Sequence, residues 1–299
     1  MKKTLIVRIG EGLGNQLFMY ANAYSLSKKF DYILYIDNES GFSKKRRSRS
    51  YNLDIFNIPE PICPDKLKFN NSIKNLKRKL LKLIDNIILN KRFITENIDD
   101  NKQTKFVEIS RLKSIQMYIE GHYESELYFK NFEIDLKKNL KIKQDLIDID
   151  NQYVNQIKQS NSVSIHLRKN RYSEDLNNQS TSNKEKNALF EKNLINYVYR
   201  SIKYMDNKLQ NPHYFIWSNE PDEYKELFLD PKKFTFIENN NLSIDFYLFS
   251  LCKNFIVGPS TFHWWGAWLN ENKKKICLRP KDMNPSNNKD FWPKDWISI

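Results

Sequence analysis

Long apolar runs are missing from this 299-residue sequence. No stretch of about 18 apolar residues occurs, so no transmembrane helix is expected. The opening MKKTLIVRIGEGLGNQLF has a lysine pair, but it lacks the sustained apolar core and the small-residue cleavage site of a signal peptide. We therefore expect a soluble protein that contacts membranes peripherally at most.

Cysteine is also scarce. The three cysteines, Cys63, Cys252 and Cys277, are odd in number, far apart, and each lies in or near an apolar run. This arrangement does not suit a disulfide framework, and it shows no metal-ligand spacing. It predicts reduced cysteines that pack in the core of a cytosolic protein.

Acidic residues are outnumbered by basic ones, 36 against 49, which gives a net charge of +13. Such a balance suits nucleic acid, a nucleotide or an acidic membrane surface, but it does not choose among them. A codon bias toward lysine and asparagine explains the excess equally well. Nucleic acid is the partner we do not expect, because the aromatic residues lie mainly in apolar strands and helices.

The apolar pattern predicts an α/β fold. TLIVRIG (4–10) and YILYID (32–37) are typical of buried strands, and a helical pattern lies between them. After residue 160, strands alternate with helices, which predicts a parallel, doubly wound sheet. The expected strands are 162–168, 213–218, 233–238, 254–259 and 274–280, with helices near 187–204, 220–229, 243–252 and 262–270.

The polar segment 138–160 is the expected joint between two such halves. We therefore predict an N-terminal domain over residues 1–157 and a C-terminal domain over residues 158–299.

The segment from 66 to 100 is rich in lysine, asparagine and isoleucine. Apolar residues mark one face of a helix, and basic residues crowd the rest; they are Ile73, Leu76, Leu80, Ile84 and Ile87 against Lys74, Lys77, Arg78, Lys79 and Lys82. A basic amphipathic helix can lie on anionic lipid. Equally, its apolar side can pack on the protein core, so both alternatives stand.

In open α/β sheets, ligands bind beyond the carboxyl ends of the strands. The stretch VSIHLRKNRYSED (163–175) places His166, Arg168 and Lys169 at such an end. These cations suit phosphate oxygens, which they bind through charge-assisted hydrogen bonds. The alternative is a solvated charge cluster with no ligand.

Three more features fall at strand ends. In GEGLGNQ (10–16), Gly12 and Gly14 let the backbone approach a ligand at a helix N-terminus, although a plain strand-to-helix turn explains them as well. Ser260 and Thr261 stand where a strand gives way to a helix, and Asp245 opens another helix. A nucleoside diphosphate would satisfy the cations, the helix N-termini and the carboxylate together.

Several motifs together resemble a known family. GEGLGNQLFMYANAYSLS is similar to the G-G-L-G-N-Q-x-F-x-Y-A-x-A signature of glycosyltransferase family 11, the α-1,2-fucosyltransferases. YIEGHYESELYF, VSIHLRKNRY and FIWSNE resemble its G-Y-x-Q-S-E-x-Y-F, V-x-H-x-R-R-G-D-Y and F-S-D-D segments. DFYLFSLCKNFIVGPSTFHWWGAWLN resembles its D-x-x-x-M-x-x-C-x-x-x-I-x-x-N-S-T-F-S-W-W-G-A-W-L block. The resemblance runs in order from residue 8 to about 280.

The resemblance implies a GT-B architecture, two Rossmann-like halves facing across a cleft, with an acceptor-side N-terminal half and a C-terminal half that binds the GDP-sugar. It implies GDP-fucose as donor and no metal or other cofactor. Arg168 would stabilise the leaving β-phosphate, and His166 and Asp245 would contact guanine. The remaining donor-binding residues implied are Gly12, Gly14, Asn15, Lys169, Ser218, Ser260 and Thr261, of which Asn15 would also take part in catalysis.

The chain departs from the family pattern after Arg168. Lys169 replaces the second arginine, which keeps the charge but loses the planar fork. Asn170 and Arg171 replace a Gly-Asp pair, so a carboxylate has become a cation. Glu174 or Asp175 either supplies the missing carboxylate, acts as general base toward the acceptor, or is a charge partner of the basic cluster.

The resemblance therefore implies an inverting enzyme that transfers L-fucose from GDP-β-L-fucose to the 2-hydroxyl of galactose. The expected acceptor is a galactose-containing oligosaccharide or lipid-linked glycan of a bacterial surface polysaccharide or O-antigen. The expected place is the cytoplasm, with or without peripheral contact at the anionic inner membrane. A same-fold transferase for another nucleotide sugar, and a non-catalytic nucleotide- or glycan-binding relative, are the alternatives.

Overall fold

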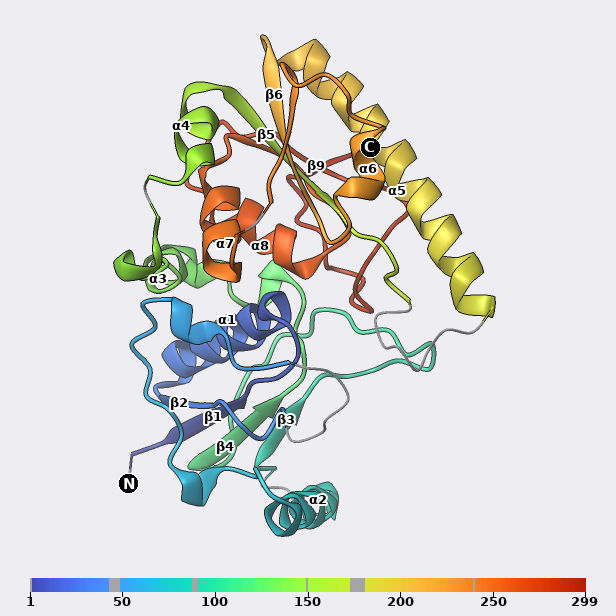
Figure 1. The fold of residues 1–299 in the computed structure, drawn as a ribbon. Helices are drawn as coiled ribbons and strands as arrows, with labels where there is room; N and C mark the ends of the chain where they lie inside the picture. The colour runs from blue at the N-terminus through green and yellow to red at the C-terminus, as the bar shows by residue number, and fades with distance from the viewer. Residues whose placement is uncertain (1, 43–48, 88–90, 149, 173–180, 239) are drawn as a thin grey trace. The chain divides into compact units, whose positions relative to one another are not determined.

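The computed structural model describes residues 2–42, 49–87, 91–148, 150–172, 181–238 and 240–299 (Figure 1). The chain forms two compact units. Unit 1 consists of Met1–Lys141 and Ser286–Pro293, and unit 2 of Ile142–Pro285 and Lys294–Ile299. The segment 142–157, which we expected in the N-terminal domain, groups with unit 2 because its helix packs on a strand and a helix of that unit.

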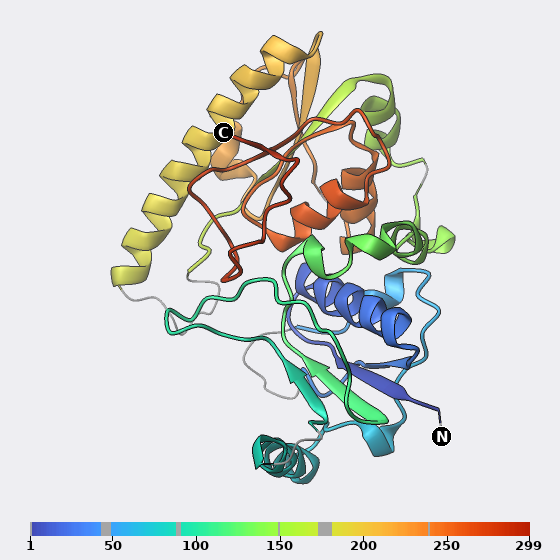
Figure 2. The same ribbon diagram turned by 180° about the vertical axis from the view of Figure 1, so that it is seen from behind.

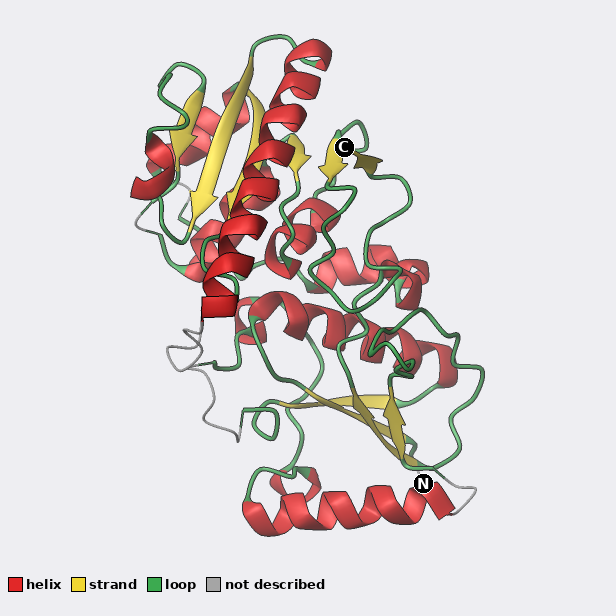
Figure 3. Ribbon diagram, turned by 90° about the vertical axis from the view of Figure 1, so that its right-hand side faces the viewer, coloured by secondary structure: helices red, strands yellow, loops and turns green. Residues whose placement is uncertain are grey.

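Unit 1 contains a parallel sheet with the strand order β2-β1-β4-β3. Its two longer helices cover opposite faces of this sheet (Figures 1 and 3). The strands are β1 (Thr4–Arg8), β2 (Ile33–Asp37), β3 (Phe93–Thr95) and β4 (Gln116–Glu120), and the helices are α1 (Leu13–Phe30), α2 (Ser72–Ile87) and α3 (Glu133–Asn139). The expected β-turn-α-β opening is confirmed by β1, α1 and β2.

Helix α1 is buried along most of its length, including polar Gln16 and Asn22. Gln16 donates to the carbonyls of Glu11 and Ser50 and accepts from the Asn52 N–H, all within 2.8–2.9 Å. A buried amide that is satisfied in this way fixes the loop against the helix. The start of α1 is therefore tied to the segment that carries Ser50 and Asn52.

Unit 2 contains a six-stranded parallel sheet with the order β10-β9-β8-β5-β6-β7. Its helices lie on both faces, as Figure 2 shows from behind. The strands are β5 (Asn161–Leu167), β6 (Pro212–Ser218), β7 (Phe234–Phe236), β8 (Asn254–Ile256), β9 (Cys277–Arg279) and β10 (Ile297–Ser298). The helices are α4 (Gln152–Gln159), α5 (Thr181–Lys208), α6 (Asp222–Lys225), α7 (Leu242–Leu251) and α8 (Thr261–Leu269).

Alternation along the strands decides which side chains meet which helix. Val163, Ile165 and Leu167 of β5 point to one face, where they form a core with the apolar side of α5. Ser164 and His166 point to the other face, toward α7 and α8. The carboxyl end of β5 therefore presents His166 to the side on which α7 and α8 begin.

The three cysteines and the tryptophans of α8 lie in the protein core. All three cysteines are free and buried. Trp264, Trp265 and Trp268 are buried too, and Trp264 and Trp268 stack with ring centroids 6.0 Å apart. The tryptophan cluster of α8 therefore belongs to the core of unit 2.

Among the described residues, none of the helices is both long enough and apolar enough to cross a bilayer.

Candidate functional site

The ring of His166 lies at the carboxyl end of β5, surrounded by other rings. Its centroid is 6.0 Å from that of Phe249 on α7 and 6.4 Å from that of Phe262 on α8. Its Nδ1 is buried and has no hydrogen-bond partner among the described residues. A buried polar atom left unpaired typically costs about 1–3 kcal/mol, so this atom is suited to a ligand.

The ring of His263 on α8 packs against the ring of His166. Its Nδ1 accepts the Gly258 N–H at 3.2 Å, so its Nε2 carries the proton and donates to Ser164 Oγ at 2.8 Å. The two imidazole centroids are 5.7 Å apart. Both ring nitrogens of His263 therefore have hydrogen-bond partners inside the protein, whereas Nδ1 of His166 has none among the described residues.

Burial lowers the pKa of both histidines. The pKa of His166 falls to about 3, because the ring is desolvated and Arg168 repels the protonated form. The pKa of His263 falls well below its ordinary value through desolvation and the neighbouring His166. Both rings are consequently neutral at physiological pH.

These pKa shifts predict acid sensitivity of unit 2. In the unfolded chain both rings take up protons below about pH 6.5, whereas the folded rings stay neutral at pH 5. The unfolded state then binds more protons, so stability falls as the pH is lowered. We expect the pair to cost about 3 kcal/mol of unfolding free energy between pH 6.5 and 5, measured by chemical denaturation.

Single substitutions provide the control for this acid sensitivity. His166→Asn and His263→Gln should each remove about half of the pH-dependent loss, whatever their effect on stability at neutral pH. A loss of stability that is the same in both variants as in the wild type would assign the pH dependence to other groups.

Trp217 links Asp245 to His166, because it neighbours His166 in the sheet and bonds to Asp245. Trp217 is paired with His166 in the register of β5 and β6, and its indole Nε1 donates to Asp245 Oδ1 at 3.2 Å. The Trp217 ring stacks on Phe249 with centroids 4.1 Å apart. Desolvation raises the pKa of Asp245, opposed by the neighbouring Asn240 side chain and the hydrogen bond from Trp217. A partly desolvated, oriented carboxylate is suited to paired N–H donors.

The turn before α8 brings a second unsatisfied atom to this edge. Gly258 passes so close to β5 that a Cβ there would lie 2.4 Å from the carbonyl oxygen of His166. Ser260 is the N-cap of α8, yet its hydroxyl makes no cap bond; it is buried and has no partner among the described residues. Thr261 begins the helix. Free N–H groups and a spare hydroxyl at a helix N-terminus suit phosphate.

The loop after β5 separates the two expected cations. Arg168 follows directly on β5 and is partly exposed. Lys169, in contrast, forms an ion pair with Glu223 and lies 3.9 Å from Glu191. Its N–H donates to Asn219 Oδ1 at 2.8 Å, and Ser218 Oγ caps the same turn by accepting the Glu220 N–H. Lys169 and Ser218 therefore brace the ends of β5 and β6.

The replacement of the family's Gly-Asp pair by Asn170 and Arg171 has a structural explanation. Asn170 has a φ of 56°, in the left-handed region that glycine adopts freely and asparagine tolerates best among other residues. Arg171 donates to the carbonyls of Pro259 and Pro285 at 2.8 and 2.7 Å. The cation that replaces the expected carboxylate thus holds the turn that leads to Ser260.

Unit 1 carries its own candidate residues at the N-terminus of α1. The Gly12 carbonyl accepts the N–H groups of Asn15 and Gln16 at 3.0 Å, and Gly14 is buried in the first turn. A Cβ at position 12 would lie 3.1 Å from Nη1 of Arg49, so a guanidinium stands directly over this turn. Cationic charge at a helix N-terminus strengthens an anion site.

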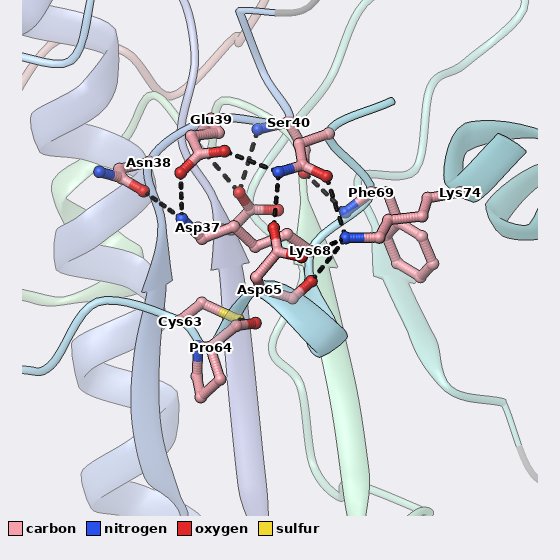
Figure 4. A network of polar contacts seen from close by, with 11 residues as sticks. Asp37, Asn38, Glu39, Ser40, Cys63, Pro64, Asp65, Lys68, Phe69 and Lys74 are labelled. Atoms are coloured by element: carbon pink, nitrogen blue, oxygen red, sulfur yellow. Dashed lines mark hydrogen bonds and ion pairs between the residues drawn. The ribbon is translucent and has the colours of Figure 1, made fainter. Parts of the chain in front are cut away.

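Beside this turn, the end of β2 carries a polar network (Figure 4). Asp37 Oδ1 accepts the N–H groups of Glu39 and Ser40, and buried Lys68 is bonded to Glu39 and to Asn38. Because its charges are paired internally, this network serves to shape the loop.

The structure thus gathers His166, Asp245, Ser260 and Thr261 at one edge of unit 2, with Arg168 on the adjoining loop. Asn15, Gly12 and Gly14 form a separate group in unit 1. Glu174 and Asp175 lie outside the described residues. Sequence reasoning missed Trp217, His263, Arg49 and the tether made by Arg171, because each is recognised only by its neighbours in space.

Two Rossmann-like units, with helix N-termini and cations at the carboxyl ends of their strands, are the architecture of the GT-B glycosyltransferases. The glycosyl transferase family 11 model matches residues 4–299, so the chain belongs to that family. Glycosyltransferase activity follows from this membership.

Relatives and solved structures agree with the family. The chain is 28% identical to an α-1,2-colitosyltransferase of Escherichia coli, covering 99% of this chain and 98% of the relative. It is 27% identical to the O-antigen biosynthesis glycosyltransferase WbnK of Escherichia coli, covering 96% and 98%. The crystal structure of the fucosyltransferase NodZ from Bradyrhizobium superposes with a TM-score of 0.54 at 14% identity, covering 89% of this chain and 92% of NodZ.

Proposed function

We propose that this protein is an inverting galactoside α-1,2-fucosyltransferase. It transfers L-fucose from GDP-β-L-fucose to the 2-hydroxyl of a galactose residue in a surface polysaccharide or O-antigen glycan. Membership of family 11 and the similarity to an O-antigen glycosyltransferase support the reaction class and the kind of acceptor. The structure of NodZ soaked with GDP-fucose superposes with a TM-score of 0.52, and it supports only the fold that would hold such a donor.

The observation that carries the proposal is a pair of buried atoms at the edge of unit 2, Nδ1 of His166 and Oγ of Ser260, which have no hydrogen-bond partner in the described part of the chain. They lie on strands and turns that also position Asp245 and the start of α8. A guanosine diphosphate offers a donor edge for Asp245, a polar contact for His166, and phosphate oxygens for Ser260 and Thr261. A single ligand would therefore satisfy all of these groups.

Bond breaking then places negative charge on the departing GDP and oxocarbenium character on the fucose. We assign Arg168 to the β-phosphate, where a fixed cation stabilises the charge that develops in the transition state. In this proposal Lys169 and Ser218 keep the loop in position, and the family resemblance assigns donor-binding roles to Gly12, Gly14 and Asn15. The reaction proceeds without a metal, and Glu174 or Asp175 is the candidate general base.

A second donor deserves a direct comparison, because the relative with 28% identity is named for colitose. Colitose is L-fucose without its 3-hydroxyl, so the two sugars differ by one polar group. The proposal names GDP-fucose as the donor, and a site that bonds its 3-hydroxyl would discriminate strongly against GDP-colitose, which lacks that group.

The test is a donor panel with EDTA present throughout. Purified protein is incubated with GDP-fucose, GDP-colitose, GDP-mannose or UDP-galactose and short galactosides, and products are identified by mass and linkage. Fucosyl transfer to the 2-hydroxyl is the expected result. Colitosyl transfer alone would replace the donor in the proposal, and a protein that neither transfers nor hydrolyses any donor would be a binding relative.

A further inference from the structure

Helix α2 of unit 1 carries its apolar face on the outside. Six leucine and isoleucine side chains of this helix are between 45% and 85% exposed; they are Ile73, Leu76, Leu80, Leu83, Ile84 and Ile87. Figure 3 shows α2 below the sheet of unit 1, on the face opposite α1. Of the two alternatives, packing of this face on the protein core is therefore wrong, and a lipid-facing helix remains.

The polar side of α2 is the side that contacts the protein. Arg78 binds the buried carboxylate of Glu120 through two nitrogens, both at 2.5 Å, and Lys82 binds the same carboxylate. Nearer the helix end, Asp85 accepts the backbone N–H groups of Arg92 and Phe93 and pairs with the Arg92 guanidinium. These bonds fix the rotation of the helix about its own axis.

Further contacts hold the beginning and the middle of α2 in the same orientation. Lys74 binds Asp65 at 2.7 Å, the contact drawn at the right of Figure 4. Leu81, on the inner side, packs against the cluster of Phe69, Phe93 and Tyr118. The outward direction of the apolar face is thus built into the unit, because reversing it would break buried ion pairs.

Charge borders this apolar face on both sides. With 3.6 residues per turn, Lys77 falls at one edge of the face and Lys79 at the other, and both are exposed. Lysines in such positions extend their ammonium groups outward while their methylene chains lie along the apolar surface. The whole chain adds a net charge of +13.

We propose that α2 is a docking surface for an anionic lipid bilayer. The helix lies parallel to the membrane plane, its leucines and isoleucines enter the boundary between headgroups and acyl chains, and Lys77 and Lys79 meet the lipid phosphates. A protein partner fits less well, because the face is purely aliphatic and bordered by lysine. Protein interfaces instead favour tyrosine, tryptophan and arginine and are depleted in lysine.

Flotation with vesicles tests this proposal on the full-length protein. We expect it to float with vesicles of phosphatidylcholine and phosphatidylglycerol, and the double variant Leu76→Glu/Leu80→Glu to bind at least tenfold more weakly. Ile134→Glu is the control, since Ile134 is another exposed aliphatic side chain, 86% exposed, and lies on α3 instead of α2. It should bind as the wild type does, and all three proteins should keep the same Tm.

The lysine borders have their own variant. Lys77→Gln/Lys79→Gln should lose about fivefold in binding for each lysine on anionic vesicles. On pure phosphatidylcholine the same double variant should bind like the wild type, which separates the electrostatic contribution from the apolar one.

Three results would overturn the proposal. They are absence of vesicle binding by the wild type, binding that the α2 variants leave unchanged, and a dimer in sedimentation that Leu76→Glu/Leu80→Glu converts to a monomer without any vesicle binding. The last would assign the face to a second copy of the chain. None of these measurements involves a sugar donor, so they are independent of the proposed transfer reaction.

Discussion

Replacing Arg168 with alanine should lower kcat for sugar transfer by about 10²–10³-fold and abolish the rise in Tm that GDP produces. The guanidinium follows directly on β5, and it is close enough to His166 to depress the pKa of that ring. In the proposed reaction it stabilises charge on the departing diphosphate, which grows in the transition state. Transfer rates with saturating donor and thermal shifts with millimolar GDP measure the two effects.

Two further variants separate charge from geometry. Arg168→Lys keeps the charge but loses the planar fork, so it should fall between the alanine variant and the wild type. Arg200→Ala removes an exposed arginine from α5 and should change neither quantity. If the Arg168→Ala protein is stabilised by GDP as strongly as the wild type, the diphosphate binds elsewhere.

Much of the fold was predictable because parallel strands buried on both faces read as short apolar runs. The strands of unit 2 fall within one or two residues of several expected bounds, as in β5 and β6. Strands β3 and β10 were missed, since two or three residues give no periodic signal. Strand β4, QMYIE, was missed because polar residues end its short apolar core.

Only those residues of the candidate site that directly follow a strand or open a helix could be predicted from the sequence. His166, Asp245 and Ser260 follow from their positions after strands or at helix starts. The bond from Trp217 to Asp245 and the support of His263 depend on register and helix packing, which one sequence does not encode locally. The engagement of Lys169 with Glu223 likewise depends on the path of two loops.

The orientation of helix α2 could not be predicted from the sequence either. Its amphipathic pattern was plain in the sequence, but the pattern is the same whether the apolar face points inward or outward. Only the partners of the polar face decide this, and they lie on β4 and in the loop before α2. The partner carboxylates Glu120 and Asp65 are distant from most of the helix in sequence, so periodicity alone does not find them.

Asp245→Asn should weaken GDP binding by about 10²-fold, because the carboxylate is proposed to accept two N–H donors of guanine. A hydrogen bond to a charged group is worth about 1.5–3 kcal/mol, and asparagine replaces one acceptor with a donor. Calorimetry with GDP gives the dissociation constants. Trp217→Phe, which removes the indole bond that orients Asp245, should cause a smaller loss of about tenfold.

Inosine diphosphate provides the decisive comparison, since hypoxanthine lacks the 2-amino group of guanine. The wild type should bind GDP about tenfold more tightly than IDP, the value of one such bond. In Asp245→Ala the preference should disappear, because both oxygens that could accept a hydrogen bond from the 2-amino group are gone. A variant that binds weakly but still prefers GDP over IDP would show that another residue recognises the guanine base. Lost discrimination alone therefore identifies Asp245 as the group that reads the base, and overall affinity does not.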